Sequence, residues 1–173
     1  MKAAKLLANV LFHLSRLAAL LYAAIALYVG AVLLLFSVTG KGPIAVSDSR
    51  FTVYYPFTGK PFFLGEYSLS FVVVSLVSMF IYVLFIWLLS EVFNAFRGER
   101  LFTPGNVKRL WRFSMLNLLT PAAGISFLLV VGELYSSAIM IAMLHLLIGV
   151  FAFFMLTIFK QGLELQQEQD LIL

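Results

Sequence analysis

The chain has 173 residues, of which 62% are hydrophobic and only 12% are charged, and its formal net charge is +4. A soluble domain is nearer half apolar and a quarter charged, so a water-soluble fold of this length would lack the polar residues needed to cover its surface. The sequence contains no cysteine, which excludes disulfides, thiolate metal sites and redox chemistry at sulfur.

Four stretches of the chain are apolar enough to cross a bilayer, which takes about 20 helical residues each. They cover roughly residues 17–38, 69–93, 113–131 and 138–159. A cleaved signal peptide is the alternative for the first stretch, but its apolar run is too long and no clean small-residue cleavage site follows it. The sequence therefore predicts an all-α integral membrane protein with four transmembrane helices, in a single domain over residues 1–173.

Lysine and arginine are unevenly shared among the segments that connect these stretches. Nine of them lie before residue 17, in the connection 94–112 or in the tail 160–173, and three lie in the loop 39–68. Cytoplasmic segments carry the excess of Lys and Arg in membrane proteins. We therefore expect a multi-pass protein of a bacterial inner membrane, with both termini and the connection 94–112 in the cytoplasm and the loop 39–68 outside.

The outer loop, residues 39–68, has the composition of a short β-structure. Residues 50–55 are rich in β-branched and aromatic side chains, residues 58–61 have turn chemistry, and residues 62–64 resemble a returning strand. We predict a short, irregular, aromatic extracytoplasmic hairpin between the first two helices. Its aromatic side chains are expected either to form an interfacial belt on lipid headgroups and helix ends or to act as a lid or ligand-sensing patch. These residues are Tyr54, Tyr55, Phe57, Phe62 and Phe63.

Residues 94–112, which we call the elbow, join the second and third spans. Gly98 is placed to end the second helix as a glycine cap. Thr103 and Pro104 favour a new helix start, because Thr103 can cap free amide groups and the missing N–H of Pro104 is harmless at the first helical position. A basic, amphipathic helix should follow and turn into the third span. Its cations either anchor the span against anionic lipid together with Trp111 or form a docking face for an acidic partner. The cations of the elbow are Arg97, Arg100, Lys108, Arg109 and Arg112.

The tail, "GLELQQEQDLIL", begins at Gly162 and is acidic. On a helix, Glu164 and Glu168 share one face and repel each other by a few tenths of a kcal/mol. Carboxylates at a helix C-terminus, including Asp170, also oppose the helix dipole. A free helical tail should therefore be poorly formed. We predict a clasp in which Glu164 or Glu168 pairs with an arginine of the elbow, namely Arg97, Arg100, Arg109 or Arg112. The alternative is a solvated, frayed end.

Few polar groups lie inside the predicted spans, where each needs a partner. His145 lies near the middle of the fourth span and Asn117 in the inner half of the third, while Glu91 and Glu133 are near span ends. A single histidine favours an interhelical hydrogen bond over a proton relay or a metal site. Pro121 should kink the third span. No phosphate-binding loop, catalytic triad or pair of carboxylates is found, so we expect no enzymatic activity, metal or cofactor.

Two motifs, "FRGERLFTPGNVKRL" and "IFKQGLELQQEQDLIL", together resemble the hallmark segments of the bacterial membrane proteins grouped as domain of unknown function 2975. The resemblance would cover nearly the whole chain and implies a small protein with four spans and no established activity. Gly105 stands where an acidic residue is usual, and Gln169 where Asn is common. The matching residues are Phe102, Thr103, Pro104, Asn106, Val107, Leu110, Phe159, Gly162, Glu164, Leu165, Glu168, Asp170 and Leu171.

Genes of this family often lie beside a gene for a small helix-turn-helix regulator, so the resemblance implies a membrane partner of such a regulator. We therefore expect a non-enzymatic regulatory or sensory protein that lies in a lipid bilayer. Its cytoplasmic face, made of the elbow and the tail, would bind a regulatory protein and make no direct contact with nucleic acid. The alternatives are a small transporter or an immunity protein against a membrane-active peptide, for which His145, Pro121 and the hairpin would matter, or a subunit of a larger complex.

Overall fold

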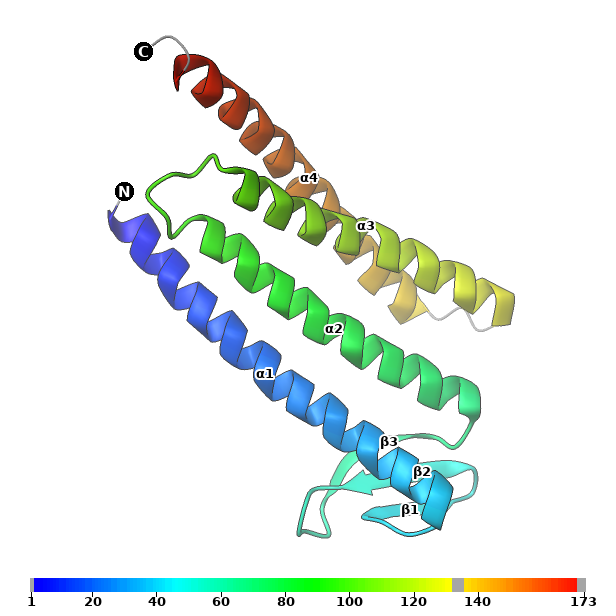
Figure 1. Cartoon of the computed structure of the whole chain (residues 1–173). Helices are drawn as coiled ribbons and strands as arrows, with labels where there is room; N and C mark the ends of the chain where they lie inside the picture. Colours follow the sequence, from blue (N-terminus) through cyan, green and yellow to red (C-terminus); the bar gives the residue numbers. More distant parts are fainter. Residues whose placement is uncertain (1, 132–135, 171–173) are drawn as a thin grey trace. The chain divides into compact units, whose positions relative to one another are not determined.

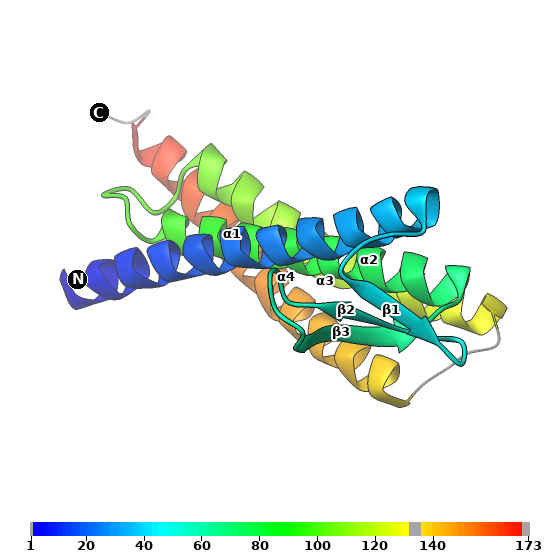
Figure 2. The same ribbon diagram turned by 90° about the horizontal axis from the view of Figure 1, so that it is seen from below.

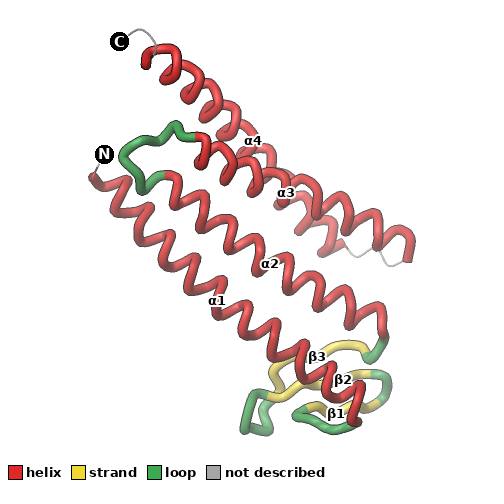
Figure 3. Tube along the Cα trace, in the orientation of Figure 1, coloured by secondary structure: helices red, strands yellow, loops and turns green. Residues whose placement is uncertain are grey.

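The computed structural model describes residues 2–131 and 136–170, which form helices and one small sheet (Figure 1). Glu133 and Leu171, both named above, lie outside the described residues. Figure 3 separates the helices, the strands and the loops. In chain order the elements are α1 (Lys2–Thr39), β1 (Ile44–Ser47), β2 (Arg50–Tyr54), β3 (Pro61–Glu66), α2 (Leu69–Ala95), α3 (Pro104–Val131) and α4 (Ser136–Asp170).

The four helices of the described chain are all long and apolar enough to cross a membrane, as the sequence predicts. Their surfaces carry many large apolar side chains without a protein neighbour. Met140 is 73% exposed and Phe151 is 70% exposed on α4, for example. Such surfaces are costly in water but are solvated by lipid tails. The protein is therefore a multi-pass membrane protein, and its helices extend several residues beyond the apolar stretches.

The sequence suggests one domain, whereas the contacts divide the chain into two compact units. One unit comprises Met1–Arg16 together with Phe85–Leu173, and the other comprises Leu17–Leu84. The first contains the elbow, the tail and the packed pair α3 and α4, and we call it the elbow unit. The second contains the sheet and the helical segments that flank it, and we call it the sheet unit.

The predicted two-stranded hairpin is instead part of a three-stranded antiparallel sheet in the order β1-β2-β3 (Figure 2). β1 pairs with β2 from Ile44 opposite Val53 to Ser47 opposite Arg50. Both residues of the intervening turn, Asp48 and Ser49, have positive φ, as a type I′ hairpin turn requires. The sequence analysis missed β1 because this turn lacks the glycine that usually marks such a hairpin.

The sheet unit has its own apolar core, made by side chains from the sheet and from both helices. Phe51 and Val53 of β2 are 1% and 0% exposed, and they cluster with Val29 of α1. The Phe71 ring of α2 packs against Phe51, with ring centroids 6.2 Å apart. Gly65 of β3 makes room for it, because a Cβ there would lie 2.1 Å from the Phe71 ring. Phe51, the most buried aromatic residue of the loop, was therefore not one of the five predicted patch residues.

The five predicted patch aromatics have different environments. Phe57 is fully exposed at a turn with positive φ, and Tyr55 is exposed beside it. Phe62 and Phe63 are half-buried against the core of the sheet unit. The backbone carbonyl of Tyr54 accepts a hydrogen bond of 2.6 Å from the hydroxyl of Tyr28 in α1. The ring of Tyr55 packs on that of Phe62, with centroids 4.5 Å apart, so the predicted patch consists of both exposed and half-buried side chains.

In the elbow unit, α3 and α4 lie side by side (Figures 1 and 2). Gly149 of α4 permits their close approach, since a Cβ there would lie 2.9 Å from the Leu118 side chain and 3.1 Å from the Asn117 backbone. The Ser114 hydroxyl donates to the Gly149 carbonyl at 3.1 Å. A small residue at a contact between two helices is the usual means by which transmembrane helices come together.

Two local expectations for α2 and α3 need correction. Gly98 does not cap α2, because the helix ends at Ala95 and Gly98 does not have the positive φ of a glycine cap. Hydrogen bonds from Phe96 to Phe93 and from Arg97 to Asn94 close the helix instead. The basic helix of the elbow is not a separate element, because α3 runs without a break from Pro104 through Pro121 to Val131.

The close contact at Gly149 can be tested by adding one methyl group. We expect Gly149→Ala to lower the free energy of unfolding by about 1–3 kcal/mol, because an overpacked contact must push α3 and α4 apart. Gly124→Ala on α3 is the matched control, since nothing lies within 4 Å of its added Cβ. The control should raise stability by roughly 0.5–1 kcal/mol through helix propensity. Thermal unfolding in detergent measures both, and equal unfolding temperatures would contradict the close contact.

Candidate functional site

The start of α3 is fixed by the cap that the sequence predicts. The Thr103 hydroxyl accepts a hydrogen bond of 3.2 Å from the Asn106 amide, and its carbonyl accepts one of 3.1 Å from Val107. Pro104 is the first residue of the helix. This arrangement satisfies amide groups that would otherwise be unpaired at the helix start. The position of every elbow side chain that follows depends on it.

Asn106 ties the end of α2 to the beginning of α3. Its side chain is buried, and Nδ2 donates to the carbonyls of Ala95, at 3.2 Å, and Leu101, at 2.8 Å. Ala95 is the last residue of α2, where carbonyls lack a helical donor. The amide group of Asn106 supplies that donor. The sequence marks Asn106 only as part of a motif, and the structure gives it this bridging role.

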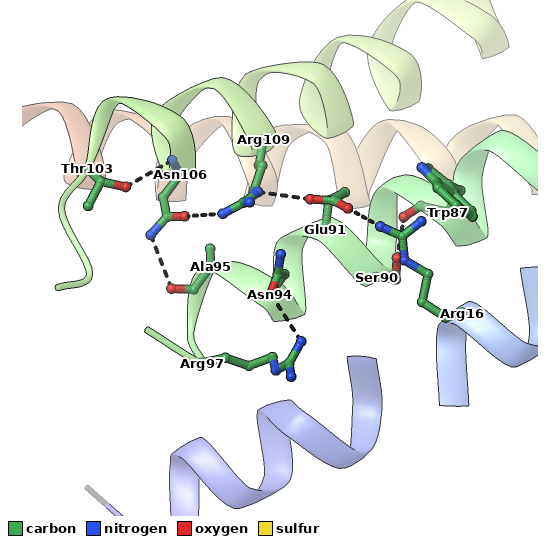
Figure 4. A network of polar contacts seen from close by, with 10 residues as sticks. All are labelled: Arg16, Trp87, Ser90, Glu91, Asn94, Ala95, Arg97, Thr103, Asn106 and Arg109. Carbon is green, nitrogen blue, oxygen red and sulfur yellow. Dashed lines mark hydrogen bonds and ion pairs between the residues drawn. The ribbon is translucent and has the colours of Figure 1, made fainter. Parts of the chain in front are cut away.

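Glu91 is the centre of a polar network in the elbow unit (Figure 4). Its Oε2 accepts a hydrogen bond of 2.8 Å from Nε of Arg109, and its Oε1 accepts one from Nη2 of Arg16. Nη1 of Arg109 also donates to Oδ1 of Asn106 at 2.7 Å. The guanidinium of Arg16 lies 3.4 Å from the centre of the Trp87 ring. One carboxylate therefore joins the N-terminal part of α1, the end of α2 and the start of α3.

The network is partly shielded from solvent, so the loss of its central charge should be costly. The side chains of Arg16 and Glu91 are 20% and 21% exposed. Nη1 of Arg16 is buried and has no hydrogen-bond partner among the described residues. A guanidinium in this position depends on the nearby carboxylate for its stability. Sequence analysis names Glu91 as a polar candidate but does not identify its partner Arg16, which lies 75 residues away.

A groove of about 750 Å³ lies beside this network, within the elbow unit. Four of its lining side chains are cationic, three are asparagines, and none of the lining residues is a carboxylate. The lining residues are Lys5, Leu6, Asn9, Asn94, Ala95, Arg97, Gly98, Arg100, Thr103, Asn106 and Arg109. The charge and the hydrogen-bond donors of this groove suit an anion.

Two of the groove's arginines are held in place by neighbouring side chains. Nη1 of Arg97 donates to Oδ1 of Asn94 at 3.2 Å, and its guanidinium lies 4.2 Å from the centre of the Phe12 ring. Arg109 is fixed by Glu91 and Asn106. Arg100, in contrast, is exposed. The predicted elbow cations thus divide into positioned and solvent-facing groups, and Lys5 and Asn9 are groove residues that sequence analysis did not identify.

The predicted ionic clasp between tail and elbow is not formed. Among the described residues the ion pairs are Arg16–Glu91 and Arg109–Glu91, and neither Glu164 nor Glu168 takes part in one. The contact between the two segments is apolar instead. The Phe102 ring lies against Gly162, where a Cβ would be 2.6 Å from the ring, and packs on Phe159 with ring centroids 5.5 Å apart. We call this contact the apolar clasp.

The tail is helical up to Asp170, although a free helical tail was expected to be poorly formed. The apolar clasp explains the difference, because it anchors α4 through Phe159, which is 2% exposed, and Gly162. Packing of this kind contributes more than the few tenths of a kcal/mol of repulsion between two glutamates. The charged side chains of the tail stay exposed to solvent. The exposed charged residues of the elbow and the tail include Arg100, Arg112, Glu164, Glu168 and Asp170.

The intramembrane polar residues His145 and Asn117 are near neighbours across α3 and α4. Nδ1 of His145 lies 2.8 Å from Oδ1 of Asn117, and Nδ2 of Asn117 donates to the Phe113 carbonyl at 2.8 Å. The Phe85 ring packs edge-on against the imidazole, with centroids 5.0 Å apart. In residues 2–131 and 136–170 no group of His, Asp and Glu side chains is arranged to hold a metal ion. The arrangement is that of an interhelical hydrogen bond.

Comparison with known proteins identifies one family. A family model described as "Protein of unknown function (DUF2975)" matches residues 51–173, which include the elbow, the tail and the two later strands of the sheet. The match is shorter than the near-complete coverage expected from the two motifs. Comparisons with curated proteins and with solved structures gave no match.

The role of Glu91 can be tested with an isosteric substitution. We expect Glu91→Gln to lower the free energy of unfolding by roughly 1–3 kcal/mol, because Arg16 and Arg109 would lose their shared counter-charge in a partly buried site. Glu99→Gln is the control, since Glu99 is exposed in the elbow. Its effect should stay within about 0.5 kcal/mol. Thermal unfolding of the purified variants measures the difference, and equal stability would argue against the network as an anchor of the elbow.

Proposed function

The chain belongs to the family described as "Protein of unknown function (DUF2975)", and because that description assigns no activity, we propose a function from the geometry of the elbow and the tail. The protein is a non-enzymatic regulatory or sensory membrane protein. The face made by its elbow and tail binds a cytoplasmic partner, such as a small helix-turn-helix regulator. Its four apolar helices retain this face at the membrane.

We also infer the orientation of the protein in a bacterial inner membrane. Both termini and the elbow lie in the cytoplasm, and the sheet lies outside. The support is the distribution of cations, of which nine lie in the terminal segments and the elbow and three in the outer loop. An even number of spans agrees with termini on the same side. This orientation places the elbow and the tail where a cytoplasmic regulator would meet them.

The observation that carries the proposal is the apolar clasp. The packing of Phe102 on Gly162 joins the elbow to the tail without using the charges of either segment. A clasp made of ion pairs would have neutralised the carboxylates internally. Instead, Glu164 and Glu168 remain exposed on the helix α4, which includes them. An ordered surface with charges that are not used internally is suited to a partner of opposite charge.

The sign of the tail's charge selects the kind of partner. Between Gly162 and Asp170 the tail carries three carboxylates and no Lys or Arg. Small DNA-binding proteins carry a basic surface that serves as their electrostatic footprint on nucleic acid. The tail would attract such a surface and hold the regulator at the membrane. The protein itself would then need no direct contact with nucleic acid.

Charge-matched variants of the tail test this proposal. We expect Glu164→Gln/Glu168→Gln to weaken binding of the proposed helix-turn-helix regulator by roughly two- to thirtyfold, the effect of losing two exposed ion pairs. Gln167→Lys/Gln169→Lys is the control, because it changes the charge of the same helix by the same amount but keeps both glutamates. Co-purification from detergent, followed by titration of the purified pair, measures the binding.

The control should retain clearly more binding than the glutamate variant. Equal losses in the two variants would mean that only the net charge of the tail matters and that Glu164 and Glu168 form no defined contact. A regulator that does not co-purify with the unaltered chain would contradict the proposed function itself.

A further inference from the structure

We propose that the groove of the elbow unit is a binding site for a phosphate-bearing anion, either the phosphate of a lipid headgroup or a free phosphate. This inference does not depend on the partner proposed for the tail. It rests on three properties of the groove, which are its uncompensated positive charge, its fixed hydrogen-bond donors and its position at the ends of membrane-spanning helices.

The charge of the groove is not compensated by its own residues. Lys5, Arg97, Arg100 and Arg109 line it, and no carboxylate is among the lining side chains. Of these cations only Arg109 takes part in an ion pair with a described residue, and its partner Glu91 is shared with Arg16. At least three positive charges therefore face the groove without a counter-charge in the described chain. A multiply charged anion would lower the resulting electrostatic energy.

The donors of the groove come from three segments and converge on one space. α1 supplies Lys5, the loop between α2 and α3 supplies Arg97 and Arg100, and α3 supplies Arg109. A phosphate group has several acceptor oxygens in different directions, so it can meet donors from several sides. Guanidinium groups match it in a forked geometry. A single carboxylate group, with two oxygens in one plane, would meet fewer of these donors.

Two of the three groove arginines, Arg97 and Arg109, are positioned before a ligand arrives. Arg97 is held by Asn94 and by the ring of Phe12. Arg109 donates through Nε and Nη1 to Glu91 and Asn106, which fixes its plane and leaves its remaining N–H groups for a ligand. Donors that are already ordered lose little conformational entropy on binding. This pre-organisation distinguishes the groove from a set of mobile surface lysines.

The place of the groove explains how a membrane lipid would reach it. The lining residues belong to the first turns of α1, the end of α2 and the start of α3, which are helix ends rather than the apolar middles of the spans. In a bilayer, helix ends lie at the level of the headgroups. Basic pockets between transmembrane helices at this level bind anionic headgroups. A volume of about 750 Å³ accommodates a group of that size.

The experiment uses the full chain in nanodiscs and has two arms. In the first arm, nanodiscs of phosphatidylcholine are compared with nanodiscs that also contain phosphatidylglycerol. Native mass spectrometry counts the lipids that stay bound to the protein after it is released from the nanodisc. In the second arm, inorganic phosphate is titrated into phosphatidylcholine nanodiscs at constant ionic strength, with calorimetric detection. Retention of phosphatidylglycerol alone identifies a headgroup site, and binding of inorganic phosphate identifies a site for free phosphate. Either result supports the proposal.

Two double variants with equal loss of charge make the test specific. Arg97→Gln/Arg100→Gln alters the groove, whereas Lys108→Gln/Arg112→Gln removes two exposed cations of α3 that do not line it. We expect the groove variant to lose on the order of tenfold in binding, as for the loss of charge-assisted hydrogen bonds to phosphate. The control variant should bind like the unaltered chain. Lys5→Gln provides a second groove variant if the first lowers the unfolding temperature.

Three outcomes would overturn the proposal. The first is an equal loss of binding in the groove and control variants, which would indicate non-specific attraction by net charge. The second is unchanged binding in both groove variants. The third is an unaltered chain that neither retains phosphatidylglycerol over phosphatidylcholine nor binds inorganic phosphate. None of these outcomes bears on the tail glutamates, so the proposed function is tested separately.

Discussion

The carboxylate of Glu91 is the constraint on which the elbow depends. It is partly buried, and it accepts hydrogen bonds from Arg16 of α1 and Arg109 of α3. A charge with little access to water needs a counter-charge and hydrogen-bond donors close by. The pairing of Arg16 with Glu91 joins the N-terminal part of α1 to the end of α2, and the pairing of Arg109 with Glu91 fixes the side chain of Arg109. Arg109 in turn bonds to Asn106, which closes the end of α2. The form of the groove follows from this chain of contacts.

In the elbow and the tail, apolar packing and charged groups have different roles. Gly162 has no side chain, so the ring of Phe102 can lie directly on α4, and Phe159 closes the contact from a position one turn earlier. Apolar contact needs no exact matching of charges, and it holds the two segments together while their charged groups face outward. An ionic clasp through Arg97, Arg100 or Arg109 would have used arginines that now line the groove. The structure therefore keeps two sets of charges available at the elbow and the tail, one positive and one negative.

Features that depend on local chemistry could be predicted from the sequence, and features that depend on packing could not. The four spans follow from hydrophobicity alone, and the start of α3 follows from Thr103 and Pro104, which act within one turn. The pairing of Arg16 with Glu91 joins residues 75 positions apart, so no local pattern in the sequence indicates it. The strand β1 was missed because its turn has an unusual sequence. The ionic clasp was expected because opposite charges were visible in the sequence, whereas the role of Gly162 required knowledge of which ring lies against it.

The groove and the tail belong to one unit, and their proposed ligands have opposite charges, so binding of one ligand would favour binding of the other. The groove's cations would repel a basic regulator that approached the tail. An anion bound in the groove would remove part of that repulsion. The sign of the coupling is therefore positive, and by linkage the regulator would strengthen binding of the anion by the same factor. Salt reduces this coupling, because charges more than about 10 Å apart are largely screened at moderate ionic strength. Thr103 lines the groove, and its neighbour Phe102 touches Gly162 of the tail. A membrane protein with this arrangement would report the state of its phosphate site through its hold on a cytoplasmic regulator.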